Sequence, residues 1–102
     1  MSQRHLNDLR NALERRRWRI VDEQPGDDYQ IAATWLIQRP DGSHATHIDF
    51  ECMPELEPQP IEKAIGCTVR ENRKIEAYFA RIERTWPVEL EEFIGDLAAW
   101  AK

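Results

Sequence analysis

Residues 44–52, with the sequence HATHIDFEC, place two histidines, two carboxylates and a cysteine within nine positions. Side chains of these types bind transition metals, and a histidine beside a carboxylate is the simplest general-base pair. On a helix, His44 and His47 would lie about one turn apart on one face, whereas on a strand residues three apart point to opposite faces. Apolar and polar residues alternate from His47 to Cys52, which indicates a strand. We therefore do not expect the two histidines to share a metal.

The alternation places His47, Asp49 and Glu51 on one face of this strand, on side-chain steps roughly 7 Å apart. Two such neighbours can bind one cation, and Asp49 can orient the His47 ring as a general base. The opposing interpretation is the solvated face of a half-buried strand, where polar residues are required in any case. A catalytic metal site normally has three protein ligands, and no second segment is obliged to complete one. We therefore favour the solvated face and predict no cofactor.

Two turn signals predict how this strand pairs with its neighbours. Alternating patterns predict strands over 17–23 and 29–39 in addition to 44–52. The segment Pro40 to Ser43 predicts a tight hairpin, and Pro25 to Asp28 predicts a four-residue loop. The expected neighbours are Trp35 with Ile48, Ala33 with Phe50 and Ile31 with Cys52 in the second hairpin, and Trp18 with Trp35 and Ile20 with Ala33 in the first.

The same register gathers polar side chains on the face away from the core. Neighbouring strands are about 4.8 Å apart, so an arginine two strands away can reach toward Asp49. Such a surface can hold a small polar ligand or a protein partner, or its opposite charges can simply stabilise the sheet. The candidate binding residues form a row of Arg19, Thr34 and Asp49, a row of Arg17, Leu36 and His47, and Glu51 beyond them.

Apolar residues at three- and four-residue spacing predict one helix at each end of the chain. Ser2 can cap the first helix, which we expect to continue to about Arg16. Thr85 and Pro87 begin the last helix. Both apolar stripes can cover the same face of the sheet. The stripes consist of Leu6, Leu9 and Leu13 in the first helix, and of Leu90, Phe93, Ile94, Leu97 and Trp100 in the last.

The segment between the third strand and the last helix allows two interpretations. Residues 53–60 hold three prolines and predict a loop, after which a short helix over 60–66 ends at Gly66. We favour a helix over 73–84, with Ile75, Tyr78, Phe79 and Ile82 as its stripe, but two added strands also fit 67–83. The fold class is α+β, a single domain over 1–102. It is an antiparallel meander of three strands, or of four or five, with the N- and C-terminal helices packed on one face.

Composition and charge restrict the classes of function. The 102-residue chain has a net charge of -5, yet its first 20 residues carry six arginines and a net charge of +4. Clustered arginines can bind nucleic-acid phosphates, but no aromatic residues are interleaved with them here. Solvation of a helix is the favoured interpretation. No segment resembles a signal peptide or a membrane span, and Cys52 and Cys67 lack CxxC spacing. We expect a cytoplasmic protein with two reduced thiols.

These observations favour a protein without chemistry of its own. We expect a protein-binding module that contacts a partner, or a second copy of itself as a homodimer, through the exposed sheet face. The first alternative is a small metal-binding or acid-base enzyme that uses His47, Asp49 and Glu51, with Arg19 holding an anionic substrate. The second alternative is nucleic-acid binding by the arginine-rich first helix. No membrane partner is expected.

Overall fold

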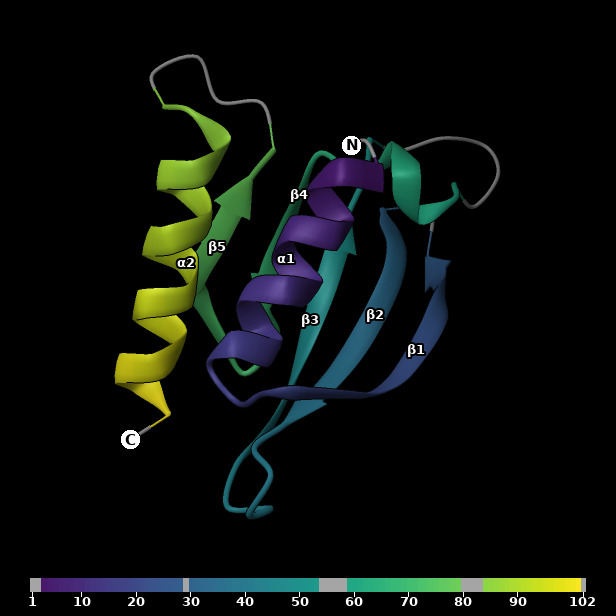
Figure 1. Ribbon diagram of the computed structural model, residues 1–102. Coiled ribbons are helices and arrows are strands. Elements are labelled where there is room, and N and C mark those ends of the chain that lie inside the picture. The colour runs from purple at the N-terminus through teal and green to yellow at the C-terminus, as the bar shows by residue number, and fades with distance from the viewer. Residues whose placement is uncertain (1–2, 29, 54–58, 80–83, 102) are drawn as a thin grey trace.

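The computed structural model describes residues 3–28, 30–53, 59–79 and 84–101 of the chain. Ser2, Ile82 and the prolines within 54–58, each given a role from sequence, lie outside the described residues. The helices predicted at the two ends are both present (Figure 1). In chain order the elements are α1 (Gln3–Arg15), β1 (Arg19–Asp28), β2 (Ile31–Gln38), β3 (Ala45–Glu51), the 3-10 turn η1 (Ile61–Lys63), β4 (Gly66–Val69), β5 (Asn72–Tyr78) and α2 (Trp86–Trp100).

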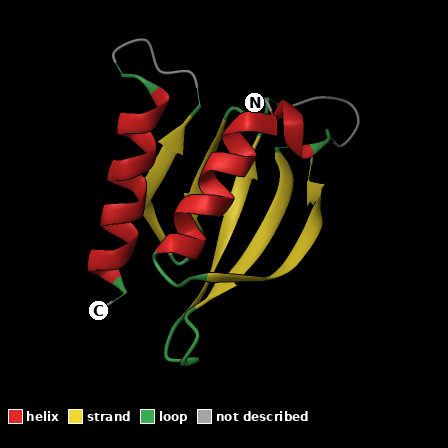
Figure 2. Cartoon of the chain, in the orientation of Figure 1, coloured by secondary structure: helices red, strands yellow, loops and turns green. Residues whose placement is uncertain are grey.

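The strands form one antiparallel sheet in the order β1-β2-β3-β4-β5, so each strand is hydrogen-bonded to the next one along the chain. Both helices lie on one face of this sheet (Figures 1 and 2). The predicted α+β class, an antiparallel meander with the terminal helices on one side, is confirmed. The sheet therefore has one face packed against helices and one face directed away from them.

The fifth strand corrects one prediction. The helix expected over 73–84 is wrong, because Asn72–Tyr78 is β5 and pairs with β4. Ile75 and Ala77 are buried on either side of the exposed Glu76, which is the two-residue period of a strand. A short apolar run fits both periods, and the pairing with β4 selects the strand.

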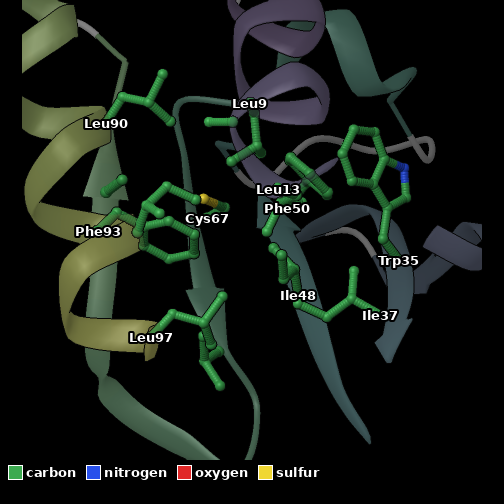
Figure 3. Close-up of a cluster of buried hydrophobic side chains, with 14 of the residues drawn as sticks. Leu9, Leu13, Trp35, Ile37, Ile48, Phe50, Cys67, Leu90, Phe93 and Leu97 are labelled. Atoms are coloured by element: carbon green, nitrogen blue, oxygen red, sulfur yellow. The ribbon is translucent and has the colours of Figure 1, made fainter. Parts of the chain in front are cut away.

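The hydrophobic core lies between the helices and the sheet (Figure 3). α1 contributes Leu9 and Leu13, and α2 contributes Phe93 and Leu97; each is at most 1% exposed. Burial of one such side chain stabilises the fold by about 1.5–3 kcal/mol. The predicted leucine and Leu-Phe-Ile stripes therefore do cover the same face. The sheet residues that they meet in this view are Trp35, Ile37, Ile48, Phe50 and Cys67.

Two aromatic clusters join the ends of the helices. Where both helices begin, His5 packs edge-on against Trp86, with ring centroids 4.9 Å apart. Where both helices end, His44 from the β2–β3 connection lies edge-on to Trp18 and Trp100, with centroid distances of 5.9 and 4.6 Å. Because the helices begin at one end of the molecule and finish at the other, α1 and α2 run parallel (Figure 1).

The register of β2 and β3 follows from the turn between them. Gly42 has a φ of 72°, the left-handed conformation that the predicted turn assigns to glycine. At the other end of the hairpin, a register shift pairs Ile31 with Glu51, so the predicted pairing of Ile31 with Cys52 is wrong. The remaining predicted pairs are present, namely Trp35 with Ile48 and Ala33 with Phe50.

The register of β1 and β2 differs from the prediction, because β1 does not turn at Pro25. The strand continues through Pro25 to Asp28, which an edge strand tolerates because the proline nitrogen needs no partner there. Irregularities on both sides of the 22–25 segment shift the pairing further. The predicted pairs of Trp18 with Trp35 and of Ile20 with Ala33 are wrong; Ile20 pairs with Ile37, and Glu23 pairs with Trp35.

The short helix predicted over 60–66 is reduced to η1, and Gly66 does not end it. Gly66 is the first residue of β4 and is buried beside Tyr78. A Cβ atom at Gly66 would lie 2.7 Å from the Ala77 carbonyl oxygen and 3.2 Å from Tyr78 Cδ1. The glycine thus permits close approach of the neighbouring strand, which is a common reason for glycine within a sheet.

Candidate functional site

The sheet face opposite the helices is covered by none of the described helices or strands (Figure 1). His47, Asp49 and Glu51 share this face, because the alternate residues Ile48 and Phe50 are fully buried in the core. Asp49 is nevertheless only 6% exposed. Its burial on an uncovered face shows that neighbouring side chains lie over it.

Arg70 and Thr34 hold Asp49. Arg70 donates from Nε to Asp49 Oδ2 (3.1 Å) and from Nη2 to Oδ1 (2.8 Å), and the Thr34 hydroxyl donates to Oδ1 (2.8 Å). The Asp49 side chain is 8% exposed, whereas that of Arg70 is 49% exposed. Burial by itself would raise the pKa of Asp49, but the hydrogen bonds from Arg70 and Thr34 and the nearby positive charge lower it. The carboxylate is therefore ionised and compensated.

Glu71 binds His47. Its Oε1 accepts hydrogen bonds from the His47 backbone N–H (2.6 Å) and from the Thr46 hydroxyl, and its Oε2 lies 2.8 Å from His47 Nδ1. Burial would raise the pKa of Glu71, but these three hydrogen bonds together lower it to about 2. The carboxylate that orients the His47 ring is thus Glu71, whereas the sequence predicted Asp49 in this role. His44 lies on the helix side of the sheet, so the histidines do point apart.

Glu51 has a third, separate partner, the Thr68 hydroxyl, which donates to Glu51 Oε1. The three residues predicted as one acid-base or metal set therefore each contact a different neighbour. Among the described residues, no group of three His, Cys, Asp or Glu side chains could hold a metal ion.

Burial raises the pKa of Cys67, so this thiol is protonated and a poor nucleophile.

The two arginines predicted from the first strand do not join this cluster. Arg19 pairs with Gln38, four residues along β2 from Thr34, and Gln24 stands opposite Thr34 instead. Arg17 precedes β1 and has a φ of 67°, the left-handed conformation that commonly follows the end of a helix. Both placements are wrong because β1 is shifted along β2. Leu36 does lie opposite His47 and is half-buried.

The residues that complete the face come from the tight turn between β4 and β5. Arg70 and Glu71 join Val69 to Asn72, which pair with each other. Sequence reasoning missed both residues, because Arg-Glu is not a turn signature of the Asn-Gly kind and the helix favoured over 73–84 leaves no strand after this turn. The available signal was the alternation that begins at Ile75.

A concave surface, the interhelix groove, lies between α1 and α2. It encloses about 960 Å³. Its floor is apolar and buried, and Trp86 Nε1 donates to Asp8 Oδ2 (3.1 Å) where the helices begin. No sequence pattern predicted the groove, because the spacing of two helices is a tertiary property. The lining residues are Ala12, Leu90 and Ile94 in the floor, and Asp8, Asn11, Glu14, Arg15, Arg16, Trp86, Pro87 and Glu91 around it.

The arginines of the first 20 residues are divided among different surfaces. The Arg10 guanidinium lies 4.8 Å from the centre of the Trp35 ring and 2.8 Å from Glu23 Oε1. Arg15 and Arg16 line the interhelix groove. Arg10 therefore lies on a different surface from Arg15 and Arg16.

No protein-family model, no curated protein and no solved structure matches this chain. Within the part of the chain that the structure describes, no helix combines the length and the apolar character needed to cross a membrane.

Proposed function

We propose that this protein is a non-catalytic binding module that holds a protein partner on the uncovered sheet face, centred on Arg70. The observation that carries the proposal is the half-exposed Arg70 guanidinium, which the buried Asp49 carboxylate holds on this face through two hydrogen bonds. An arginine that is already ordered loses less freedom when a partner contacts it. Arginine is also enriched among the residues that dominate protein interfaces.

The surroundings of Arg70 suit recognition better than catalysis. Asp49 accepts hydrogen bonds from Arg70 and Thr34, and Glu51 accepts one from Thr68. A general base must instead have a free oxygen or nitrogen that reaches a substrate proton. Leu36 supplies apolar area beside the polar residues, and the half-exposed His47 supplies a further polar group. Apolar area next to satisfied polar groups is typical of protein-binding surfaces.

The partner is a different protein or, alternatively, a second copy of this chain that uses the same face. We propose the cytoplasm as the compartment, because Cys52 and Cys67 are both buried thiols, as expected in a reducing environment. Acid-base chemistry at His47 is the second candidate function. It is favoured only by the contact between His47 Nδ1 and Glu71 Oε2.

Two matched substitutions test the binding proposal. Leu36→Glu places a charge on the sheet face beside His47, and Val88→Glu places the same charge at an exposed apolar position on α2. A protein captured from the native cells with the wild-type chain is identified, purified and titrated calorimetrically against each variant. We expect Leu36→Glu to weaken binding about tenfold or more and Val88→Glu to leave it within about twofold.

Circular dichroism and thermal melting establish that both variants are folded. Equal affinity of the two variants would contradict the sheet face as the binding surface. Failure of the wild-type chain to bind any purified candidate, together with turnover that depends on His47 and Glu71, would favour the acid-base alternative.

A further inference from the structure

The interhelix groove has charges distributed unevenly along its length. Asp8 and Glu91 line it toward the end where both helices begin, and Arg15 and Arg16 line it where α1 finishes. Glu14 also lines the basic end and reduces its charge without cancelling it. The groove therefore changes from acidic to basic along the helices.

Four of these charges form no ion pair within the described part of the monomer. They are all exposed, namely Glu14, Arg15, Arg16 and Glu91. By contrast, Glu92 on the neighbouring position of α2 is paired with Arg84. The groove thus presents unpaired charges of both signs above an apolar floor.

We infer that two copies of this chain associate through the interhelix groove, with α2 of each copy lying antiparallel in the groove of the other. A twofold rotation perpendicular to the helices places the acidic part of one groove over the basic part of the other. Glu91 of each copy then faces Arg15 and Arg16 of the second copy. A groove with this polarity is complementary to itself, and no other partner is needed to match both ends.

The exposed ridge of α2 has the shape that such packing requires. Glu91, Gly95 and Ala99 are spaced four residues apart and are all exposed, so they lie along one side of the helix. A Cβ atom at Gly95 would meet no atom within 4 Å. Helix axes approach to 8–10 Å depending on the side chains at the contact, and a ridge with glycine at its centre permits the closest approach. Glycine inside a helix disfavours the helix relative to alanine, and nothing in the monomer requires it at this position.

Charge exchange provides a test that distinguishes this surface from every other. The purified chain is studied by sedimentation over a wide concentration range, and a complex of twice the 12.1 kDa mass of one chain is expected. Arg15→Glu combined with Arg16→Glu, and separately Glu91→Arg, should each raise the dissociation constant about tenfold or more. Mixing these two variants should restore association, because each repulsive contact becomes an attractive one in the mixed dimer.

Two further variants complete the design. Gly95→Leu has open space in the monomer and a higher helix propensity than glycine, so it should not lower the melting temperature of dilute protein, and it should abolish association. Arg73→Glu reverses an exposed charge on β5 and should leave association unchanged. A monomer at all concentrations overturns the inference, as does a dimer that survives Gly95→Leu or a mixture of the charge variants that stays monomeric.

Discussion

Arg70 covers Asp49 from 21 residues away, through Nη2 to Oδ1 at 2.8 Å and Nε to Oδ2 at 3.1 Å. Asp49 lies on the central strand β3, and Arg70 lies in the turn between β4 and β5. The pair therefore attaches the last hairpin to the middle of the sheet on the face that carries no helix.

Arg70→Ala should lower the free energy of unfolding by about 1–3 kcal/mol, because it leaves a buried carboxylate without its cation. Because the Arg70 side chain is half-exposed, the loss of free energy of unfolding should be smaller than for a fully buried ion pair. Urea unfolding at neutral pH measures it. Arg73→Ala is the control, because Arg73 is an exposed arginine on β5, and it should change the free energy of unfolding little. Equal stability of the two variants would show that Asp49 does not depend on Arg70.

Glu71 should make stability depend on acidity. Its pKa is lowered to about 2 in the folded chain from an ordinary value of 4.5. The ionised Glu71 therefore contributes fully to the free energy of unfolding at pH values above 4.5, and this contribution is lost as the pH falls toward 2. Glu71→Gln should therefore be less stable than the wild type at about pH 7, with a difference that narrows by about pH 3. Urea unfolding at the two pH values measures the difference.

Thr46→Val is the companion variant for this prediction. It removes one of the hydrogen bonds to Glu71 and keeps the shape of the buried side chain. It should raise the pKa of Glu71 and move the loss of stability to higher pH. A difference between wild type and Glu71→Gln that is constant with pH would contradict an ionised, hydrogen-bonded Glu71. Glu71→Gln should still lose some stability in acid, because the pKa of Asp49 is also lowered.

Gly95→Ala and Gly66→Ala should have opposite effects. Alanine at Gly95 meets no atom within 4 Å and should stabilise α2 by about 0.5–1 kcal/mol, a rise of a few degrees in melting temperature. Alanine at Gly66 would press on the Ala77 carbonyl oxygen and should destabilise the sheet by about 1–3 kcal/mol. Thermal melting of dilute protein tests both. Stabilisation by Gly66→Ala would show that β4 and β5 are spaced more widely.

His44 should act as an aromatic ring rather than as a hydrogen-bonding group. Its Nε2 is buried without a hydrogen-bond partner in the described part of the chain, and its ring lies between Trp18 and Trp100. His44→Ala should cost about 1–3 kcal/mol through the lost edge-on contacts, whereas His44→Phe should retain the stability of the wild type. Denaturant unfolding followed by tryptophan fluorescence compares them. Equal losses in both variants would assign the stabilisation to the ring nitrogens.

Local chemistry predicted much of the fold. The helical stripes that end in Leu13 and Trp100 are recognisable because helix periodicity is a property of the segment itself. The β2–β3 register is recognisable because Gly42 fixes the turn, and the pairs closest to a tight turn have little freedom. The β1–β2 register was not recognisable, because Pro25 signals a turn in sequence and is tolerated in an edge strand in three dimensions.

The candidate site was predicted only on one strand. Alternation placed His47, Asp49 and Glu51 on the correct face of β3, since side-chain parity is local. Their partners came from elsewhere: Arg70 replaced Arg19, and Glu71 took the role assigned to Asp49. These contacts join residues 21 to 24 positions apart, so they depend on a hairpin whose own pattern fits helix and strand alike.

By itself the sequence determined which segments are amphipathic, which faces they bury, and which polar side chains of β3 point away from the core, because these properties are set by residues within a few positions of one another. Only the tertiary structure decided which cation covers Asp49, which carboxylate orients His47, and how far apart α1 and α2 lie. Those outcomes depend on the register of whole strands and the separation of whole helices, and the packing of the shared core sets both.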